Sequence, residues 1–216
     1  MISIDLVIPE IFISISIMFL LILGVFKKNG SSLVHYFSMG FLLITGILII
    51  NNPLKTSATL FSGSYIVDDL SSFMKIITIF GGIIVLSISS KYLKMFNIFL
   101  IEYPILILCS ILGMMVMISA NDLMVFYIGL ELQSLALYVL AAFNRDELRS
   151  SESGLKYFVF SALCSGWLLY GCSLIYGFSG STNFNIIGET MVSTNYGLTF
   201  GIVFILVGLA FKISAV

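Results

Sequence analysis

Charged residues are scarce in this sequence. Of its 216 residues only 10% are charged, whereas 59% are hydrophobic. Soluble globular domains have about 25% charged and about 45–50% apolar residues, so the composition excludes an ordinary soluble fold. It also excludes disorder, which requires low hydrophobicity. The formal net charge is −1, which leaves no basic surplus to attract nucleic acid, so we also exclude nucleic-acid binding.

Histidine and cysteine are also rare. His35 is the single histidine, so a haem held by two histidines cannot form within this chain. The three cysteines, Cys109, Cys164 and Cys172, lie in apolar runs without zinc or iron–sulfur spacing. We interpret them as small buried hydrophobes. The sequence therefore predicts no metal, no cofactor and no redox centre in this chain.

Long apolar runs dominate the rest of the sequence, which has a mean hydropathy of +1.13. A membrane-spanning helix needs about 20 residues. Between the runs, the segments 51–69 and 178–195 are polar and are predicted to be loops. These patterns predict an all-α polytopic membrane protein with seven transmembrane helices, at 9–26, 33–50, 70–90, 102–119, 123–142, 154–177 and 196–216.

The distribution of basic residues predicts the orientation. With the N-terminus outside, the inner loops are 27–32, 91–101 and 143–153. The only basic residue in the outer loops is Lys55. Basic residues concentrate in cytoplasmic loops, so the N-terminus is predicted outside and Val216 inside. The inner loops contain Lys27, Lys28, Lys91, Lys94, Arg145 and Arg149.

Glu131 is the sharpest candidate site residue. It follows Leu123, the first residue of its predicted span, by about 12 Å at 1.5 Å per residue. Its helical neighbours Tyr127, Ser134 and Tyr138 share its face, which gives an apolar helix one polar stripe. The alternative is a structural acid that holds helices together by hydrogen bonds. We favour a functional role, because a carboxylate at this depth is costly.

Lys212 is the second candidate. Gly208, Gly201 and Gly197 share its helix face, and small residues allow another backbone or water to approach. Desolvation disfavours a charged lysine and a nearby carboxylate favours it, so a lysine whose partner moves can take up and release a proton. The alternative is a lysine that extends to the inner interface. Position alone leaves both open.

The remaining polar residues in or near the spans have simpler interpretations. From position alone, Lys156 and, more strongly, Lys75 are expected to extend their ammonium groups to the membrane surface. Glu102 and Asp122 lie at span ends and are expected to face water. His35 lies beside an inner loop and is expected at the interface.

Five stretches of the sequence resemble a known family, the N-type antiporter-like subunit of respiratory complex I, called subunit 2 in mitochondria. The resemblance covers most of the chain and is strongest from 121 to 216. The stretches that carry it are YIGLELQSL at 127–135, LYVLAA at 137–142, SSESGLKYF at 150–158, LYGCSLIYG at 169–177 and FKISAV at 211–216.

The resemblance implies an architecture. The family has about fourteen membrane helices with two inverted five-helix repeats, of which this chain would be the first half. Residues 1–69 would form the first two helices and an outer loop, and residues 70–216 would begin the proton-translocation unit. The family continues beyond Val216, so we expect either a fragment or one product of a split gene, with a separate chain that carries the second half.

The resemblance also implies a function, proton translocation driven by electron transfer from NADH to quinone. Glu131 matches the family's fifth-helix glutamate, Lys212 the lysine of its broken seventh helix, and Lys156 a sixth-helix lysine on the same polar path. No role is carried over to Lys75. FMN and iron–sulfur clusters would lie in partner subunits, and the partners would be other membrane-arm subunits of complex I and lipids.

Two alternative functions stay open, a subunit of a multi-subunit sodium/proton antiporter and a non-transporting membrane scaffold. The sequence around Glu131 favours complex I over the antiporter. The N-terminus shows neither a cleavable signal peptide nor an Arg-rich transit peptide. We expect a multi-pass protein of the mitochondrial inner membrane with its N-terminus on the intermembrane-space side, and the bacterial inner membrane is the alternative.

Overall fold

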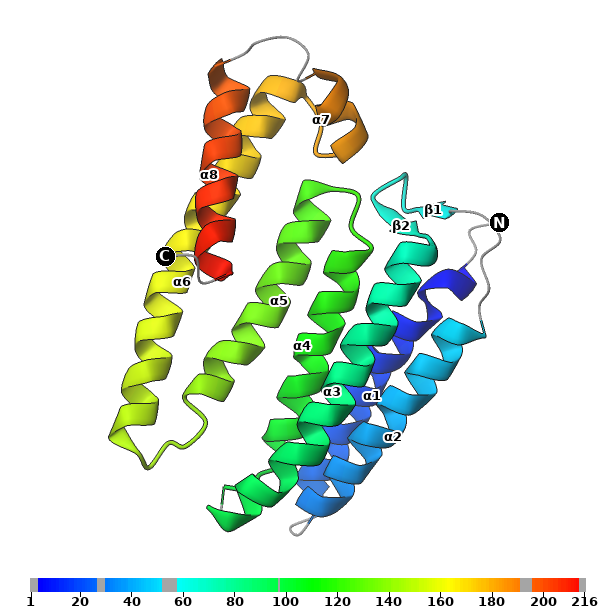
Figure 1. The fold of residues 1–216 in the computed structure, drawn as a ribbon, viewed down its shortest axis with the longest axis vertical. Coiled ribbons are helices and arrows are strands. Elements are labelled where there is room, and N and C mark those ends of the chain that lie inside the picture. The colour runs from blue at the N-terminus through cyan, green and yellow to red at the C-terminus, as the bar shows by residue number, and fades with distance from the viewer. Residues whose placement is uncertain (1–3, 27–29, 52–57, 97, 191–195, 214–216) are drawn as a thin grey trace.

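The chain folds into long helices that lie roughly side by side (Figure 1). The computed structural model describes residues 4–26, 30–51, 58–96, 98–190 and 196–213. A short 3-10 helix and two short strands accompany the α-helices. In chain order the elements are η1 (Ile4–Val7), α1 (Ile8–Phe26), α2 (Ser31–Ile50), β1 (Ala58–Leu60), β2 (Tyr65–Val67), α3 (Asp69–Met95), α4 (Glu102–Ile118), α5 (Leu123–Ala141), α6 (Leu148–Ser179), α7 (Phe184–Thr190) and α8 (Tyr196–Lys212).

The helices confirm the predicted all-α membrane architecture. Within the described residues, α1, α2, α3, α5 and α6 are long and apolar enough to cross a membrane. The other two predicted spans correspond to α4 and α8, which are apolar and 17 residues long. That length is about the shortest that spans a bilayer. The orientation remains a prediction, and Lys27, Lys28 and Lys55, on which it partly rests, lie outside the described residues.

Four predicted loops differ from the structure. The polar segment 148–153 is the first part of α6, not a loop, and α3 continues to Met95. The segment 51–69 contains the antiparallel hairpin of β1 and β2, in which Leu60 pairs with Tyr65. The segment 178–195 contains α7. Polarity alone does not distinguish a loop from a short helix or strand that tertiary contacts stabilise.

The hairpin is stabilised by its contact with the turn between α4 and α5. The amide of Ile66 donates to the carbonyl oxygen of Ser119 at 2.8 Å, and the side-chain amide of Asn121 donates to that of Gly63 at 2.7 Å. Tyr65 and Val67 point into the protein and are buried. These contacts hold the hairpin against the end of the bundle.

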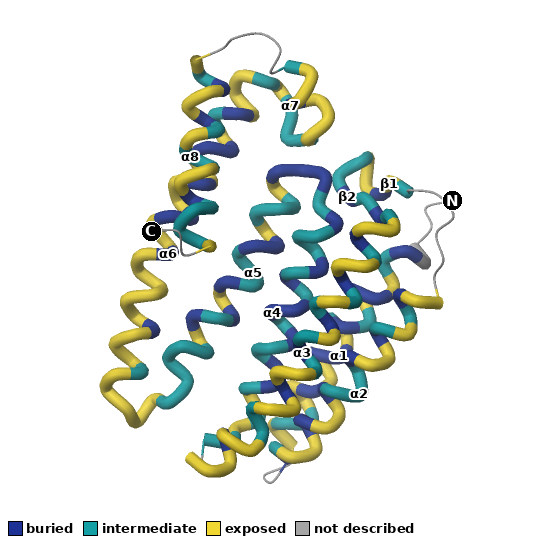
Figure 2. The backbone as a smooth tube through the Cα atoms, viewed as in Figure 1, coloured by how far each residue is buried: buried dark blue, intermediate teal, exposed yellow. Residues whose placement is uncertain are grey.

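Two of three buried apolar clusters lie between the α-helices, and the third lies at the hairpin around Leu60, Tyr65 and Val67. Figure 2 shows the buried positions along each helix. The first lies between helices α1, α2, α3 and α4 and contains fully buried residues such as Ile13, Leu42, Leu86 and Leu108. The second joins α5, α6, α7 and α8 around Leu168 and Cys172. Many outer side chains are large and apolar, for example Ile88 at 70% exposure, as expected for helices that face lipid. The division at residues 69 and 70 remains a prediction.

Candidate functional site

Helix α5 presents Glu131, Ser134 and Tyr138 on one face. The helix begins after Asp122, whose carboxylate accepts a hydrogen bond from the amide of Met124 at 2.8 Å. Asp122 also accepts from the hydroxyl of Thr182 at 2.5 Å and is only 9% exposed. The expectation that Asp122 faces water is therefore wrong, because its oxygens cap a helix and bind a neighbouring loop. Glu102, in contrast, is exposed as expected.

The position of α5 is fixed by a close backbone contact with α4. A methyl group added at Gly129 would lie 2.8 Å from the amide nitrogen of Met117. A methyl group added at Gly113 would lie 2.6 Å from the amide nitrogen of Gln133. Only glycine fits such an approach without a shift of one helix. These two glycines therefore set the depth and rotation of the helix that carries Glu131.

A second close contact, between α6 and α8, positions Lys212. A methyl group added at Gly171 of α6 would lie 2.8 Å from the carbonyl oxygen of Gly201, and one at Gly208 would lie 3.1 Å from that of Cys164. The glycines predicted on the face of Lys212 therefore allow another helix backbone to approach, and this part of the prediction is confirmed. Gly197 instead meets the ring of Phe178.

The two predicted residues of α5 and α8 meet. Lys212 Nζ lies 3.2 Å from Glu131 Oε1, 3.0 Å from Ser134 Oγ and 2.9 Å from Tyr138 Oη. The side chains of Lys212 and Glu131 are 10% and 22% exposed. An ammonium group has three N–H donors, and here each donor has an acceptor. The site can therefore hold a charged lysine away from bulk water.

Two serines of α6 extend this network, and sequence reasoning missed both. Ser165 Oγ donates to Glu131 Oε1 at 2.5 Å. Ser161 Oγ is hydrogen bonded to the hydroxyl of Tyr138. The two serines are four residues apart in the apolar middle of α6, and this spacing was the available signal. Ser161, Tyr138, Lys212, Glu131 and Ser165 form one continuous hydrogen-bonded chain across three helices.

Two residues predicted near this cluster do not join it. Tyr127 packs against the apolar cluster of α5, α6 and α8 instead. Lys156 lies near the start of α6, with its side chain 64% exposed and its ammonium 2.6 Å from Glu152 one turn earlier. The structure therefore does not bring Lys156 to Lys212, and its place on a proton path stays a prediction.

A second buried ion pair lies near the opposite side of the bundle, where α1, α3 and the hairpin meet. Lys75 Nζ lies 2.7 Å from Glu10 Oε1, and both side chains are at most 6% exposed. The hydroxyl of Tyr65 donates to Glu10 Oε1 at 2.8 Å and accepts from Lys75 at 3.1 Å. Burial, together with the Glu10 carboxylate, raises the pKa of the Tyr65 phenol, which therefore stays protonated. The expectation that Lys75 extends to the membrane surface is wrong.

Two further residues differ from expectation. Sequence reasoning missed Glu10, although an acid two residues inside the first apolar run was a visible signal. His35 lies near the predicted inner end of α2, but it is only 3% exposed and packs between helices instead of facing outward. The three cysteines are free, and Cys164 and Cys172 are buried as predicted, whereas Cys109 is only partly buried.

Comparisons of the sequence with known proteins point to one family. Residues 120–216 match the family described as NADH:quinone oxidoreductase/Mrp antiporter, TM. Over 214 residues the chain is 76% identical to NADH-quinone oxidoreductase subunit N of Pelagibacter ubique, covering 99% of this chain and 45% of that protein. The subunit N of Rhodospirillum rubrum is 46% identical over 213 residues, which cover 96% of this chain and 44% of that protein. The chain thus spans about 45% of the length of these relatives.

Solved structures share the fold at low sequence identity. Respiratory complex I from Thermus thermophilus with bound aureothin contains a chain with a TM-score of 0.75 and 23% identity, over 94% of this chain and 43% of that chain. The Mrp complex of Dietzia sp. contains one with a TM-score of 0.73 and 18% identity, over 97% and 41%. The fold is thus common to both kinds of complex. Residues 120–216 of this chain thus match the family described as NADH:quinone oxidoreductase/Mrp antiporter, TM, and nearly the whole chain is similar to about 45% of the length of bacterial NADH-quinone oxidoreductase subunit N.

Proposed function

We propose that this chain is part of a proton-translocating membrane subunit of NADH-quinone oxidoreductase, and that Glu131 and Lys212 form its proton-transfer site. One observation carries the proposal: a lysine ammonium inside membrane-spanning helices has a carboxylate and two hydroxyls as its three acceptors. Intramembrane ionisable residues are costly and mark ion or proton pathways. The names of the relatives support the choice of complex.

The chemistry of the site depends on the distance between Glu131 and Lys212. With the carboxylate close, the lysine keeps its proton, because an opposite charge favours the ammonium. If α5 and α8 move apart, desolvation disfavours the ammonium, and Nζ gives up its proton to a neighbouring acceptor. The hydroxyls of Tyr138 and Ser161 are hydrogen bonded to each other beside Nζ and offer a path for that proton. The lysine is then reloaded from the inner side, with Lys156 on the entry path.

The redox chemistry belongs to other chains in this proposal. FMN and iron–sulfur clusters in partner subunits would carry electrons from NADH to quinone, and this chain would respond by movement of its helices. Its three cysteines have no cluster-binding spacing. The partners we propose are the other membrane-arm subunits, a separate chain with the second half of the fold, and lipids.

We place the chain in a bacterial cytoplasmic membrane with its N-terminus outside. The relatives reported above come from bacteria, which supports the bacterial alternative over the mitochondrial location that we favoured from the sequence. The distribution of basic residues supports the orientation.

The test uses the whole complex in inverted membrane vesicles. Glu131→Gln removes the negative charge, and Lys212→Arg keeps a positive charge that does not release its proton. Both variants are expected to assemble, to retain the redox subunits and to lose most NADH-driven proton uptake, measured with a pH-sensitive dye. Glu102→Gln and Lys91→Arg alter exposed residues and serve as matched controls. Normal proton uptake in both site variants contradicts the proposal and favours a scaffold.

A cation/proton antiporter is the second candidate, because the Mrp chain shares the fold almost equally well. Mass spectrometry of the native membrane complex distinguishes the two. Co-purification with flavin and iron–sulfur subunits supports NADH-quinone oxidoreductase. A complex of multi-span subunits without redox partners supports the antiporter and overturns our assignment.

A further inference from the structure

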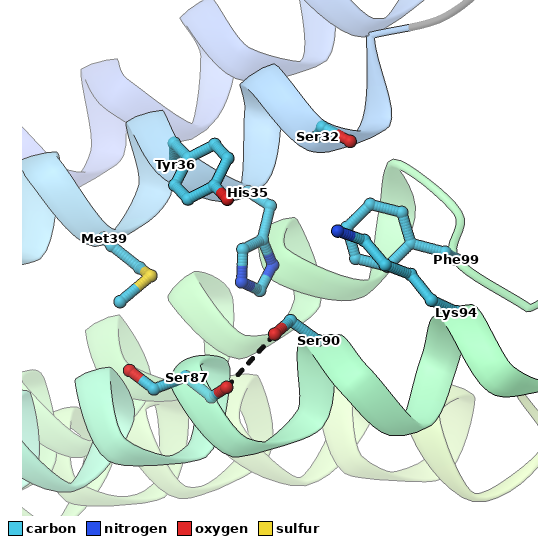
Figure 3. A pocket seen from close by; sticks show the side chains of 8 residues that line it. All are labelled: Ser32, His35, Tyr36, Met39, Ser87, Ser90, Lys94 and Phe99. Atoms are coloured by element: carbon cyan, nitrogen blue, oxygen red, sulfur yellow. Dashed lines mark hydrogen bonds between the residues drawn. The ribbon is translucent and has the colours of Figure 1, made fainter.

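A cavity of about 220 Å³ opens between the beginning of α2 and the last turns of α3. It lies at the end of the bundle that the basic residues predict to be the inner one. In Figure 3 the ring of His35 extends from α2 toward Ser87 and Ser90 of α3, and Lys94 and Phe99 border the other side. It is remote from the Glu131–Lys212 site, because it is built from the α1–α4 half of the molecule.

The charge around this cavity is positive. Lys94 is the charged residue among those that line it, and no ion pair joins Lys94 to a carboxylate within the described part of the chain. Its ammonium lies 5.1 Å from the centre of the Phe99 ring, which also lines the cavity. Lysines commonly bind phosphate groups as point charges.

The first turn of α2 adds to the positive potential. The helix begins at Ser31, and its N-cap residue Gly30 provides no side-chain acceptor for the free amides of that turn. Ser32, in this turn, lines the cavity. The unsatisfied amides and the helix dipole favour an anion at this position. The helix has 20 residues, so its dipole is fully developed.

His35 supplies independent evidence that the cavity takes a polar ligand. Its side chain lines the cavity and is 3% exposed, and its Nδ1 atom has no hydrogen-bond partner among the described residues. A buried polar atom without a partner costs about 1–3 kcal/mol. The ring also has a hydrogen bond with the backbone of Leu86. A neutral imidazole has one donor and one acceptor nitrogen, so Nδ1 is left to accept a hydrogen bond from a headgroup hydroxyl.

The surroundings of the cavity favour a lipid over a free anion. Tyr36 lines the cavity with 67% of its surface exposed, and Leu33 and Ile88 on the same two helices are also large, apolar and exposed. An amphiphile can place its phosphate at Lys94 and its acyl chains along these residues. Basic pockets between helices on the cytoplasmic side are typical sites for anionic lipid headgroups.

We propose that this cavity binds the headgroup of an anionic phospholipid such as phosphatidylglycerol. The phosphate lies between Lys94 and the first turn of α2, and the polar end of the headgroup meets His35. The lipid would hold α2 to the end of α3. This proposal does not depend on which respiratory or antiporter complex contains the chain.

The experiment uses the intact membrane complex in nanodiscs with a trace of photoactivatable phosphatidylglycerol. After illumination, peptide mapping by mass spectrometry measures label on the segments 30–39 and 87–99. The wild-type complex is expected to be labelled there, and Lys94→Gln is expected to reduce the label about fivefold, the effect of one basic residue near an anionic headgroup. Lys91→Gln is the matched control, since this exposed lysine lies on the same helix outside the cavity. Its label is expected to stay at the wild-type level.

A second variant, a second lipid probe and one competing anion distinguish loss of the site from a folding defect. His35→Phe keeps a ring in place and is expected to lower the label while the complex remains assembled. Equal label in the Lys94 and Lys91 variants overturns the proposal. Equal labelling by photoactivatable phosphatidylcholine, or full displacement by inorganic phosphate at millimolar concentration, overturns it as well, because the site would then lack selectivity for an anionic lipid.

Discussion

Lys212 Nζ and Glu131 Oε1 lie 3.2 Å apart although 81 residues separate them in the sequence. Their meeting depends on helix contacts that the glycines of α4, α5, α6 and α8 permit. The pair is therefore a property of helix packing, and small shifts of α8 relative to α5 would change the charge balance of the site.

The hydroxyl of Tyr138 is expected to stabilise the charged form of Lys212. Tyr138→Phe removes one of the three acceptors of the ammonium and breaks the contact with Ser161. Hydrogen bonds to charged groups contribute about 1.5–3 kcal/mol, so we expect roughly a tenfold or larger fall in the rate of proton uptake. Dye measurements on inverted vesicles with the intact complex check this.

Tyr127→Phe is the matched control for that variant. Tyr127 is on the same helix but packs in the apolar cluster. The complex that carries Tyr127→Phe is expected to take up protons at the wild-type rate. Equal rates in the two tyrosine variants would show that the Tyr138 hydroxyl has no role in proton transfer.

Ser165 is expected to stabilise the charged carboxylate of Glu131. Ser165→Ala removes the 2.5 Å hydrogen bond to Glu131 Oε1, which disfavours the charged carboxylate. We expect the rate of proton uptake to fall about tenfold or more, because hydrogen bonds to charged groups contribute about 1.5–3 kcal/mol. Dye measurements on inverted vesicles with the intact complex check this. Ser153→Ala, at an exposed serine on the same helix, should leave the rate unchanged. A wild-type rate in Ser165→Ala contradicts the expectation.

Close packing between α6 and α8 is expected to be essential for the stability of the complex and for proton uptake. Gly171→Ala places a methyl group 2.8 Å from the carbonyl oxygen of Gly201, so the helices must separate. Overpacking of this kind costs about 1–3 kcal/mol. We expect a lower thermal transition of the complex and a lower rate of proton uptake together.

Gly177→Ala is the control for that substitution. A methyl group at Gly177 of the same helix meets no atom within 4 Å, so stability and rate should be unchanged. If Gly171→Ala behaves like Gly177→Ala, the close approach of the two helices does not position Lys212.

The buried pair of Glu10 and Lys75 is expected to matter for stability. Removal of one partner leaves an uncompensated buried charge, which costs about 3–5 kcal/mol. Lys75→Met should therefore lower the thermal transition strongly, and the double substitution Glu10→Leu with Lys75→Met should recover much of the loss. Lys91→Met, at an exposed lysine of the same helix, should have little effect. Additive losses in the double variant contradict a direct pairing.

The sequence was sufficient to predict the polar face of α5 but not the position of the Lys75 side chain. Glu131, Ser134 and Tyr138 were predicted on one face because helical spacing fixes which side chains share a face, and the structure has all three around Lys212. Lys75 was misinterpreted, because a lysine near a helix end can extend to the surface or bind a buried acid. The choice depends on Glu10, which comes from another helix.

The sequence by itself determined the membrane class, the number of apolar helices and the polar face of α5, because these follow from composition and from the period of the helix. Only the tertiary structure decided which charges are paired. It joined Lys212 to Glu131 and Lys75 to Glu10, in each case from two different helices, whereas Lys156 and Glu152 are neighbours on one exposed helix segment. The physical reason is that an ionisable group in an apolar interior is stable only beside a partner. Which partner lies within reach is set by the packing of helices that are distant in the chain.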